Sequence, residues 1–94
     1  MKNIYQVLLV EFSSRIALST GIRKQPFTAY SENGKFMILN AKQKERSVTE
    51  KETKNFYEEF TKTGSISTQT YQNLTRNSSY LLAAVHHLKE KGSL

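Results

Sequence analysis

The clearest local structure in this 94-residue chain is encoded by residues 27–41, Phe27-Thr-Ala-Tyr-Ser-Glu-Asn-Gly-Lys-Phe-Met-Ile-Leu-Asn-Ala41. The dipeptide Asn33-Gly34 accepts the positive φ angles of a two-residue type I′ turn, so a β-hairpin is predicted, with Glu32 facing Lys35. Pairing back from the turn places four side chains on one face, Phe27, Ala29, Phe36 and Ile38, and three on the other, Tyr30, Met37 and Leu39. A two-stranded ribbon is marginally stable alone, so it must pack against helices.

The segment before the hairpin, residues 3–19, is predicted to be a helix. Its apolar side chains at positions 4, 5, 8, 9, 12 and 16 follow a helical face, although Val7-Leu-Leu-Val10 would serve equally well as a buried strand. Length favours the helix, which Asn3 can cap and Gly21 can end. So many apolar residues in one segment indicate contact with the core or with a second copy of the chain.

The segment after the hairpin begins with the charged residues 42–46, a connector or a strand end. Thr49 and Glu52 then have the spacing of a capping box, which opens a helix that runs to about Lys62. Gly64 follows the helix and is suited to end it. The inward side chains of this helix are expected to be Phe56, Tyr57 and Phe60.

The last third, from Ile66 to Gly92, is predicted to form two short helices joined by a tight turn. Ser65 or Ser67 caps the first, at about 67–74, which buries Tyr71 and Leu74 behind Ile66. Asn77 or Ser78 caps the second, at about 77–91. The buried stripe of the second is Leu81, Ala84, Val85 and Leu88. The fold class is therefore α+β in a single domain, with a helix and hairpin in 1–48 and a three-helix unit in 49–94.

Composition indicates an anionic partner. Fourteen Lys and Arg against eight Asp and Glu give a net charge of +6, which favours polyanions such as nucleic acid. Residues 1–48 hold +5 of this excess and residues 49–94 only +1. The absence of cysteine suits a reducing cytosol, and the apolar run from Ile4 to Phe12 is too short to span a bilayer. A cytoplasmic protein with no membrane partner is expected.

No pattern of side chains indicates catalysis. The neighbours His86 and His87 point about 100° apart on a helix and cannot chelate one metal ion together. Glu58 and Glu59 fail as an acid–base pair for the same reason, and the chain has no Gly-rich phosphate loop. We therefore expect no enzyme activity, no metal site and no cofactor.

The three helices predicted at 49–62, 67–74 and 77–91 resemble the helix-turn-helix core of winged-helix DNA-binding regulators. The likeness covers residues 49–94 and is closest at Ile66-Ser-Thr, at Ser78-Ser79 and at Leu88-Lys-Glu-Lys-Gly92. It implies that the first turn of the last helix enters the major groove. The implied contacts are Arg76, Asn77, Ser78, Ser79 and Tyr80, with Gln69 and Lys62 on the DNA backbone. Alternatively, Asn77 and Ser78 only cap the helix while Tyr80 packs.

The leading hypothesis is a small DNA-binding protein, a homodimer, that regulates transcription or a mobile element by occupying its site. The alternative is an adaptor or inhibitor that docks on an acidic protein through the hairpin and a basic rim. That rim, which could also contact phosphates, comprises Arg23, Lys24, Lys35, Lys42, Lys44 and Arg46. A third possibility is RNA stacking on Tyr30 and Phe36.

Overall fold

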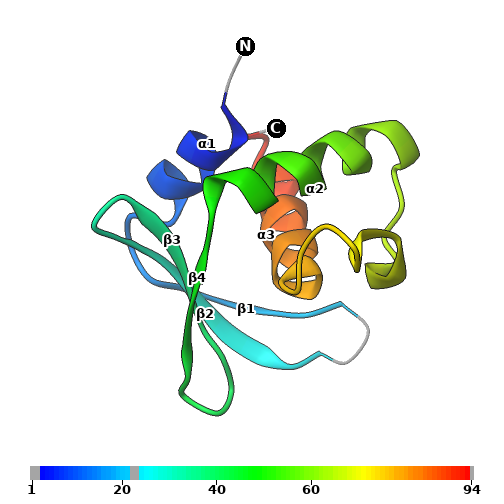
Figure 1. Cartoon of the computed structure of the whole chain (residues 1–94). Coiled ribbons are helices and arrows are strands. Elements are labelled where there is room, and N and C mark those ends of the chain that lie inside the picture. Colours follow the sequence, from blue (N-terminus) through cyan, green and yellow to red (C-terminus); the bar gives the residue numbers. More distant parts are fainter. Residues whose placement is uncertain (1–2, 22–23, 94) are drawn as a thin grey trace.

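A four-stranded antiparallel sheet in the order β1-β2-β3-β4 forms one layer of the molecule, and three α-helices cover one of its faces (Figure 1). This computed structural model describes residues 3–21 and 24–93. The elements are α1 (Ile4–Glu11), β1 (Ile16–Ser19), β2 (Pro26–Glu32), β3 (Lys35–Leu39), β4 (Glu45–Val48), α2 (Glu50–Thr63), the 3-10 turn η1 (Thr68–Tyr71) and α3 (Ser78–Glu90). The α+β class is confirmed, and the three-helix unit is matched only in part.

The central hairpin of β2 and β3 has the predicted turn and register. Asn33 and Gly34 adopt φ angles of 52° and 75°, and Glu32 lies opposite Lys35. The face predicted to be apolar is buried against the helices, with exposed fractions of 3% or less at Phe27, Ala29, Phe36 and Ile38. The sequence pattern therefore fixed both the turn and the side of the sheet that faces the core.

The N-terminal helix is shorter than predicted, because α1 ends at Glu11 and the chain then forms strand β1. Ser31 of β2 donates its backbone N–H to the Phe12 carbonyl (2.8 Å) and its hydroxyl to the Leu9 carbonyl (2.9 Å). These two bonds satisfy carbonyl groups that a helix end leaves open. Residues 16–19 instead pair with residues 26–29 of β2, so the prediction of one helix over 3–19, ended by Gly21, was wrong.

Strand β4 completes the sheet and leads directly into α2. The charged segment 42–46 is a turn followed by the start of this strand, which pairs with β3. The predicted capping box at the start of α2 is confirmed, with Thr49 and Glu52 bonded in both directions. Gly64 ends the helix in the left-handed region, at φ 63°, as its position in the sequence indicated.

The second helix of the predicted three-helix unit is reduced to the 3-10 turn η1. Leu74 is 37% exposed and Ile66 is 82% exposed, so no apolar stripe holds a longer helix against the core. Local side-chain bonds compete with helix formation, since the Ser65 hydroxyl accepts from the Ser67 N–H (3.1 Å) and pairs with the Thr70 hydroxyl (2.8 Å). Of the predicted burial, Tyr71 is correct and Leu74 is wrong.

Helix α3 packs on the sheet with the predicted stripe, and Leu81, Ala84, Val85 and Leu88 are all buried. Its far end is tied to α1, because Glu11 accepts a hydrogen bond from Lys91 Nζ (2.8 Å) and lies 2.9 Å from His87 Nε2. Hydrogen bonds to Lys91 and His87 hold the pKa of Glu11 below its usual range. Among the described residues, no helix is both long and apolar enough to cross a membrane.

Candidate nucleic-acid interface

The sheet topology gathers most of the predicted basic rim at one end. The turn between β1 and β2 and the turn between β3 and β4 lie at the same end of the sheet, opposite the Asn33-Gly34 turn. The exposed side chains there, which we call the basic end, are Lys24, Lys42, Lys44 and Arg46. Lys35 is excluded because it sits at the opposite end, and Arg23 falls outside the described residues.

The two turns that carry these lysines are fixed by hydrogen bonds. The Asn40 side chain accepts from the backbone N–H groups of Lys42 (2.9 Å) and Lys44 (3.0 Å), and the Asn40 N–H donates to the Lys44 carbonyl (3.0 Å). In the other turn the Thr20 hydroxyl accepts from the Gln25 N–H at 3.1 Å. The backbones of Lys42 and Lys44 are thus held in place, and the side chains of Lys24, Lys42 and Lys44 are exposed to solvent.

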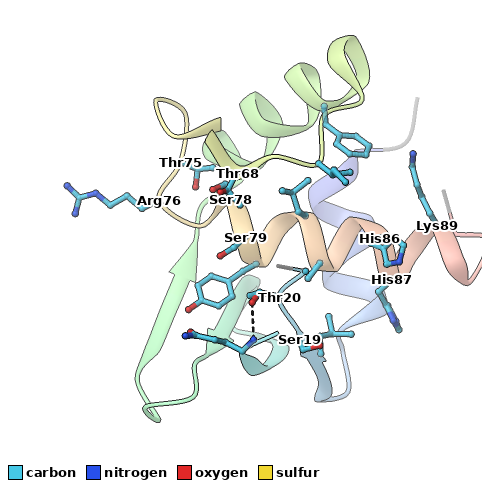
Figure 2. Close-up of a pocket in the computed structure, with 18 of the residues that line it drawn as sticks. Ser19, Thr20, Thr68, Thr75, Arg76, Ser78, Ser79, His86, His87 and Lys89 are labelled. Carbon is cyan, nitrogen blue, oxygen red and sulfur yellow. Dashed lines mark hydrogen bonds between the residues drawn. The ribbon is translucent and has the colours of Figure 1, made fainter. Parts of the chain in front are cut away.

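The basic end meets the first turn of α3. Arg46 of β4 lies over the ring of Tyr80, with its guanidinium carbon 6.0 Å from the ring centroid. The Tyr80 ring is held edge-on by Phe27 of β2, at a centroid distance of 5.0 Å and an interplanar angle of 71°. Arg76, just before α3, is exposed and projects outward from the turn (Figure 2). The two sets of residues that the sequence analysis treated separately therefore form one surface.

The start of α3, which was predicted to contact DNA bases and which we call the tip, is partly buried. Thr75, Asn77 and Ser78 are each only 7% exposed. The Thr75 hydroxyl and the Asn77 amide both donate to Glu52 Oε1 of α2, at 2.6 and 2.8 Å. Asn77 and Ser78 consequently have almost no surface to offer a base edge, contrary to the expectation from the helix-turn-helix resemblance. The tip is open at Arg76, Ser79 and Tyr80.

Glu52 is the residue that closes the tip. Burial raises the pKa of its carboxyl, but hydrogen bonds from Thr75, Thr49 and Asn77 outweigh burial and hold the pKa below its usual range. The Asn77 side chain, drawn towards this carboxylate, makes no capping bond to α3. The first amides of α3 therefore lack the side-chain cap that Asn77 or Ser78 was predicted to supply, and the Glu52 carboxylate is the negative charge that lies at this helix start.

The open side of α3 is the floor of a groove, which we call the α3 groove. Ser19 and Thr20 of the β1 side lie along one flank, and Thr68 and Thr75 lie along the other (Figure 2). The volume of the groove is about 1750 Å³, larger than the 300–1,000 Å³ typical of small-molecule sites. A groove of this size suits a segment of polymer.

The lining of the α3 groove combines cationic, apolar, polar uncharged and acidic side chains. Its cationic members are Arg46, Arg76 and Lys89. Its apolar members include Phe60, Ile66, Leu82 and Ala83, and its hydroxyl and amide members include Ser19, Gln25, Gln72 and Ser79. Glu90 is the acidic residue in the lining, and its Oε1 lies 3.0 Å from His86 Nε2. The cations therefore outnumber the acids.

Two of the predicted backbone contacts lie elsewhere. Lys62 is in the last turn of α2 and Gln69 is on η1, and both are exposed but neither lines the α3 groove. Thr68 and Gln72 of the same segment line it instead. The β1 flank was not predicted from the sequence, because residues 16–19 were expected to be helical. The alternation of Ile16 and Leu18 with smaller residues was the available signal.

The predicted stacking surface on the sheet is closed. Phe36 is fully buried between the sheet and the helices, and Tyr30, on the other face, is 4% exposed. The guanidinium of Arg15 covers the Tyr30 ring, 4.1 Å from its centroid. Bases therefore have no exposed ring to stack on at either residue, and the hypothesis of RNA binding through them is not supported.

Within residues 3–21 and 24–93, no three His, Cys, Asp or Glu side chains gather in a way that could hold a metal ion. His86 and His87 point to different partners, Glu90 and Glu11. Comparison with models of known protein families, with curated proteins and with solved structures finds no match. The winged-helix resemblance therefore stays a prediction, and function must be argued from the surface itself.

Proposed function

We propose that this protein binds DNA without catalysis and acts by occupying its site. The supporting observation is the contact between Arg46 and Tyr80, which joins the basic end of the sheet to the open part of the α3 tip. Arg46 and Arg76 line the same groove, and Lys24, Lys42 and Lys44 are exposed at the end of the sheet to which Arg46 belongs. A surface of this kind neutralises phosphates and releases their counterions, which is the main source of non-specific affinity.

In this proposal the protein contacts mainly the phosphates of the DNA backbone, and α3 does not act as a recognition helix. Base edges are within reach only of the accessible side chains at the tip, Arg76, Ser79 and Tyr80. Transcriptional or mobile-element regulation by site occupancy needs no more than this, provided that two weak sites act together. A homodimer would supply the second site and multiply the affinity through effective concentration.

The test is a fluorescence-anisotropy titration of labelled mixed-sequence DNA over a series of salt concentrations. Affinity should fall steeply as salt rises, and Lys44→Gln and Arg76→Gln should each reduce the slope of log K against log salt by about 1. Lys35→Gln is the matched control, because it removes the same charge from the opposite end of the sheet. Failure to bind any DNA at low salt would defeat the proposal.

A second candidate function, docking on an acidic protein, is favoured by the apolar side of the α3 groove. Ile66 is 82% exposed, and it lines the groove together with the partly buried Phe60, Leu82 and Ala83. Arg76→Gln separates the two candidates when DNA affinity is measured. If Arg76→Gln keeps full DNA affinity, Arg76 is not part of the DNA-binding surface, and protein docking is favoured.

A further inference from the structure

The shape of the α3 groove bears on which form of DNA it accepts. An α-helix enters the major groove as a protruding rod about 10–12 Å wide, which matches a major groove about 12 Å wide. Helix α3 lies between β1 on one side and the segment from Gly64 to Arg76 on the other, and residues of both sides line the groove with it (Figure 2). A duplex would meet these flanks before it reached α3. A single strand is narrow enough to lie between them.

The distribution of charge along the groove also suits a strand. Arg46 and Arg76 stand at the start of α3, and Lys89 stands near its end. The 13 residues of α3 rise over about 20 Å at 1.5 Å per residue, so the cations are spread along the groove rather than gathered at one point. A strand of nucleic acid carries a negative charge at every unit and can meet cations at both ends of such a path.

Between the cations lie surfaces that fit bases. Ile66 is exposed, and Leu82 and Ala83 of the same lining are partly buried. The ring of Phe60 is covered by Lys89, whose Nζ lies 4.7 Å from the ring centroid. The half-buried ring of Tyr80 is oriented by Phe27 and neighbours the Arg46 guanidinium. Sites for single strands combine a cationic path for phosphates with aromatic and apolar surfaces for base faces. An acidic peptide would use the cations but has no regular apolar plane to place on the second set of residues.

We propose that the α3 groove binds single-stranded DNA, with phosphates near Arg46, Arg76 and Lys89 and with base faces against Tyr80 and Ile66. This inference rests on the proposed DNA-binding function and specifies the form of DNA that the groove takes. The rest of the basic end continues the path of the strand beyond the groove.

The experiment compares three labelled probes by fluorescence anisotropy at one salt concentration: a single-stranded oligodeoxynucleotide of about 12 nucleotides, its blunt duplex, and the same sequence as RNA. We expect the single-stranded DNA to bind at least tenfold more tightly than the duplex. Ile66→Ser should weaken single-strand binding about five- to tenfold and leave the weak duplex binding unchanged. Because Ile66 is exposed, this substitution spares the core.

Val10→Ser is the matched control. Val10 is 73% exposed on α1 and does not line the groove, so the same kind of substitution there should leave all affinities unchanged. Far-ultraviolet circular dichroism and thermal melting of both variants check that they fold.

Each contrary outcome has a separate meaning. Equal or tighter duplex binding that Ile66→Ser does not affect overturns the single-strand inference and leaves the proposed function standing. Tighter binding of the RNA probe overturns the assignment to DNA. Poly-glutamate of the same total charge is used as a competitor. If it displaces the single strand and binds more weakly to Ile66→Ser than to the unchanged protein, the groove binds an acidic peptide and the inference is overturned. No binding of any oligonucleotide at low salt defeats the proposed function as well.

Discussion

Helices α2 and α3 begin in different ways, although one carboxylate serves both starts. At α2, Glu52 Oε2 accepts from the Thr49 N–H (3.0 Å) and hydroxyl (2.9 Å), and the Thr49 hydroxyl accepts from the Glu52 N–H (3.2 Å). At α3 the residue in the cap position, Asn77, donates its side-chain amide to Glu52 and does not cap its own helix. The cap of α2 is made between Thr49 and Glu52, which are three positions apart. The side chain that could cap α3 instead bonds to Glu52, which lies 25 positions earlier in the sequence.

The difference shows how a tertiary contact can replace the local cap of a helix. An N-cap side chain normally satisfies one of the amides that have no partner within the helix. At α3 the Glu52 carboxylate supplies the negative charge near the positive end of the helix dipole, and Thr75, Asn77 and Ser78 are each only 7% exposed. The contact to phosphates is therefore proposed for the exposed side chain of Arg76 and not for the helix amides.

The largest effect is expected from Glu52→Ala, which removes the shared carboxylate. It breaks the capping box of α2 and leaves the buried Thr75 hydroxyl and Asn77 amide without their acceptor. We expect the free energy of unfolding in urea to fall by about 3 kcal/mol, the sum of a lost cap and buried donors without partners. The control Glu58→Ala, an exposed residue of the same helix, should cost no more than about 0.5 kcal/mol. Similar losses for both variants would contradict the shared role of Glu52.

Asn77→Ala should have a smaller effect, about 1 kcal/mol. It removes one donor to Glu52, but it also removes the Asn77 Oδ1 atom, which is buried without a partner. Because Asn77 acts through Glu52, its cost should largely disappear in the Glu52→Ala background, and a double-mutant cycle in urea measures this coupling. Additive costs would mean that Asn77 stabilises the protein by another route.

The acid side of the pH–stability curve tests the same carboxylate. The pKa of Glu52 in the folded protein lies below its ordinary value of 4.5, so its contribution is complete above that value and is lost as pH falls through the folded pKa. Glu52→Gln should therefore reduce the slope of unfolding free energy against pH below about pH 4.5, by at most about 1.4 kcal/mol per pH unit. Glu11→Gln should reduce the same slope separately, because the pKa of Glu11 is lowered as well, and the two reductions should add in the double variant. A slope that Glu52→Gln does not alter would contradict the assignment.

The smallest effect is expected at the 3-10 turn. Ser67 occupies its cap position but makes no capping hydrogen bond, so Ser67→Ala should change the melting temperature by less than about 2 °C. Thr49→Ala removes the side chain that caps α2 and should lower the free energy of unfolding by about 1 kcal/mol. Its melting temperature should therefore fall further than that of Ser67→Ala. A loss at Ser67 equal to that at Thr49 would show that η1 has a cap in solution.

Elements whose contacts are local were predictable from the sequence. The Asn33-Gly34 turn, the Thr49–Glu52 box and the Gly64 helix end each depend on residues within a few positions of one another. The buried stripe of α3 repeats within its own helix. In each of these cases the preference of the chain and the tertiary fold favour the same conformation, so no competing contact changes the result.

Elements that depend on distant partners were mispredicted or missed. Residues 16–19 form a strand because β2 offers an edge to pair with, and Ser31 ends α1 from the same strand. Residues 67–74 do not form a full helix, because Ile66 and Leu74 remain exposed and do not hold the segment against the core. The candidate site belongs to this second group, since Arg46 and Tyr80 are 34 positions apart and meet only through the sheet and α3.

The sequence by itself determined the central hairpin with its buried face, the limits of α2, the inward side of α3 and the excess of positive charge, because short-range turn chemistry, side-chain periodicity and composition suffice for these features. Only the tertiary structure decided that α1 stops early, that Glu52 takes the side chain of Asn77, and that the basic turns lie beside the start of α3. These features follow from strand pairing and from the satisfaction of buried polar groups, which depend on residues that are distant in the chain.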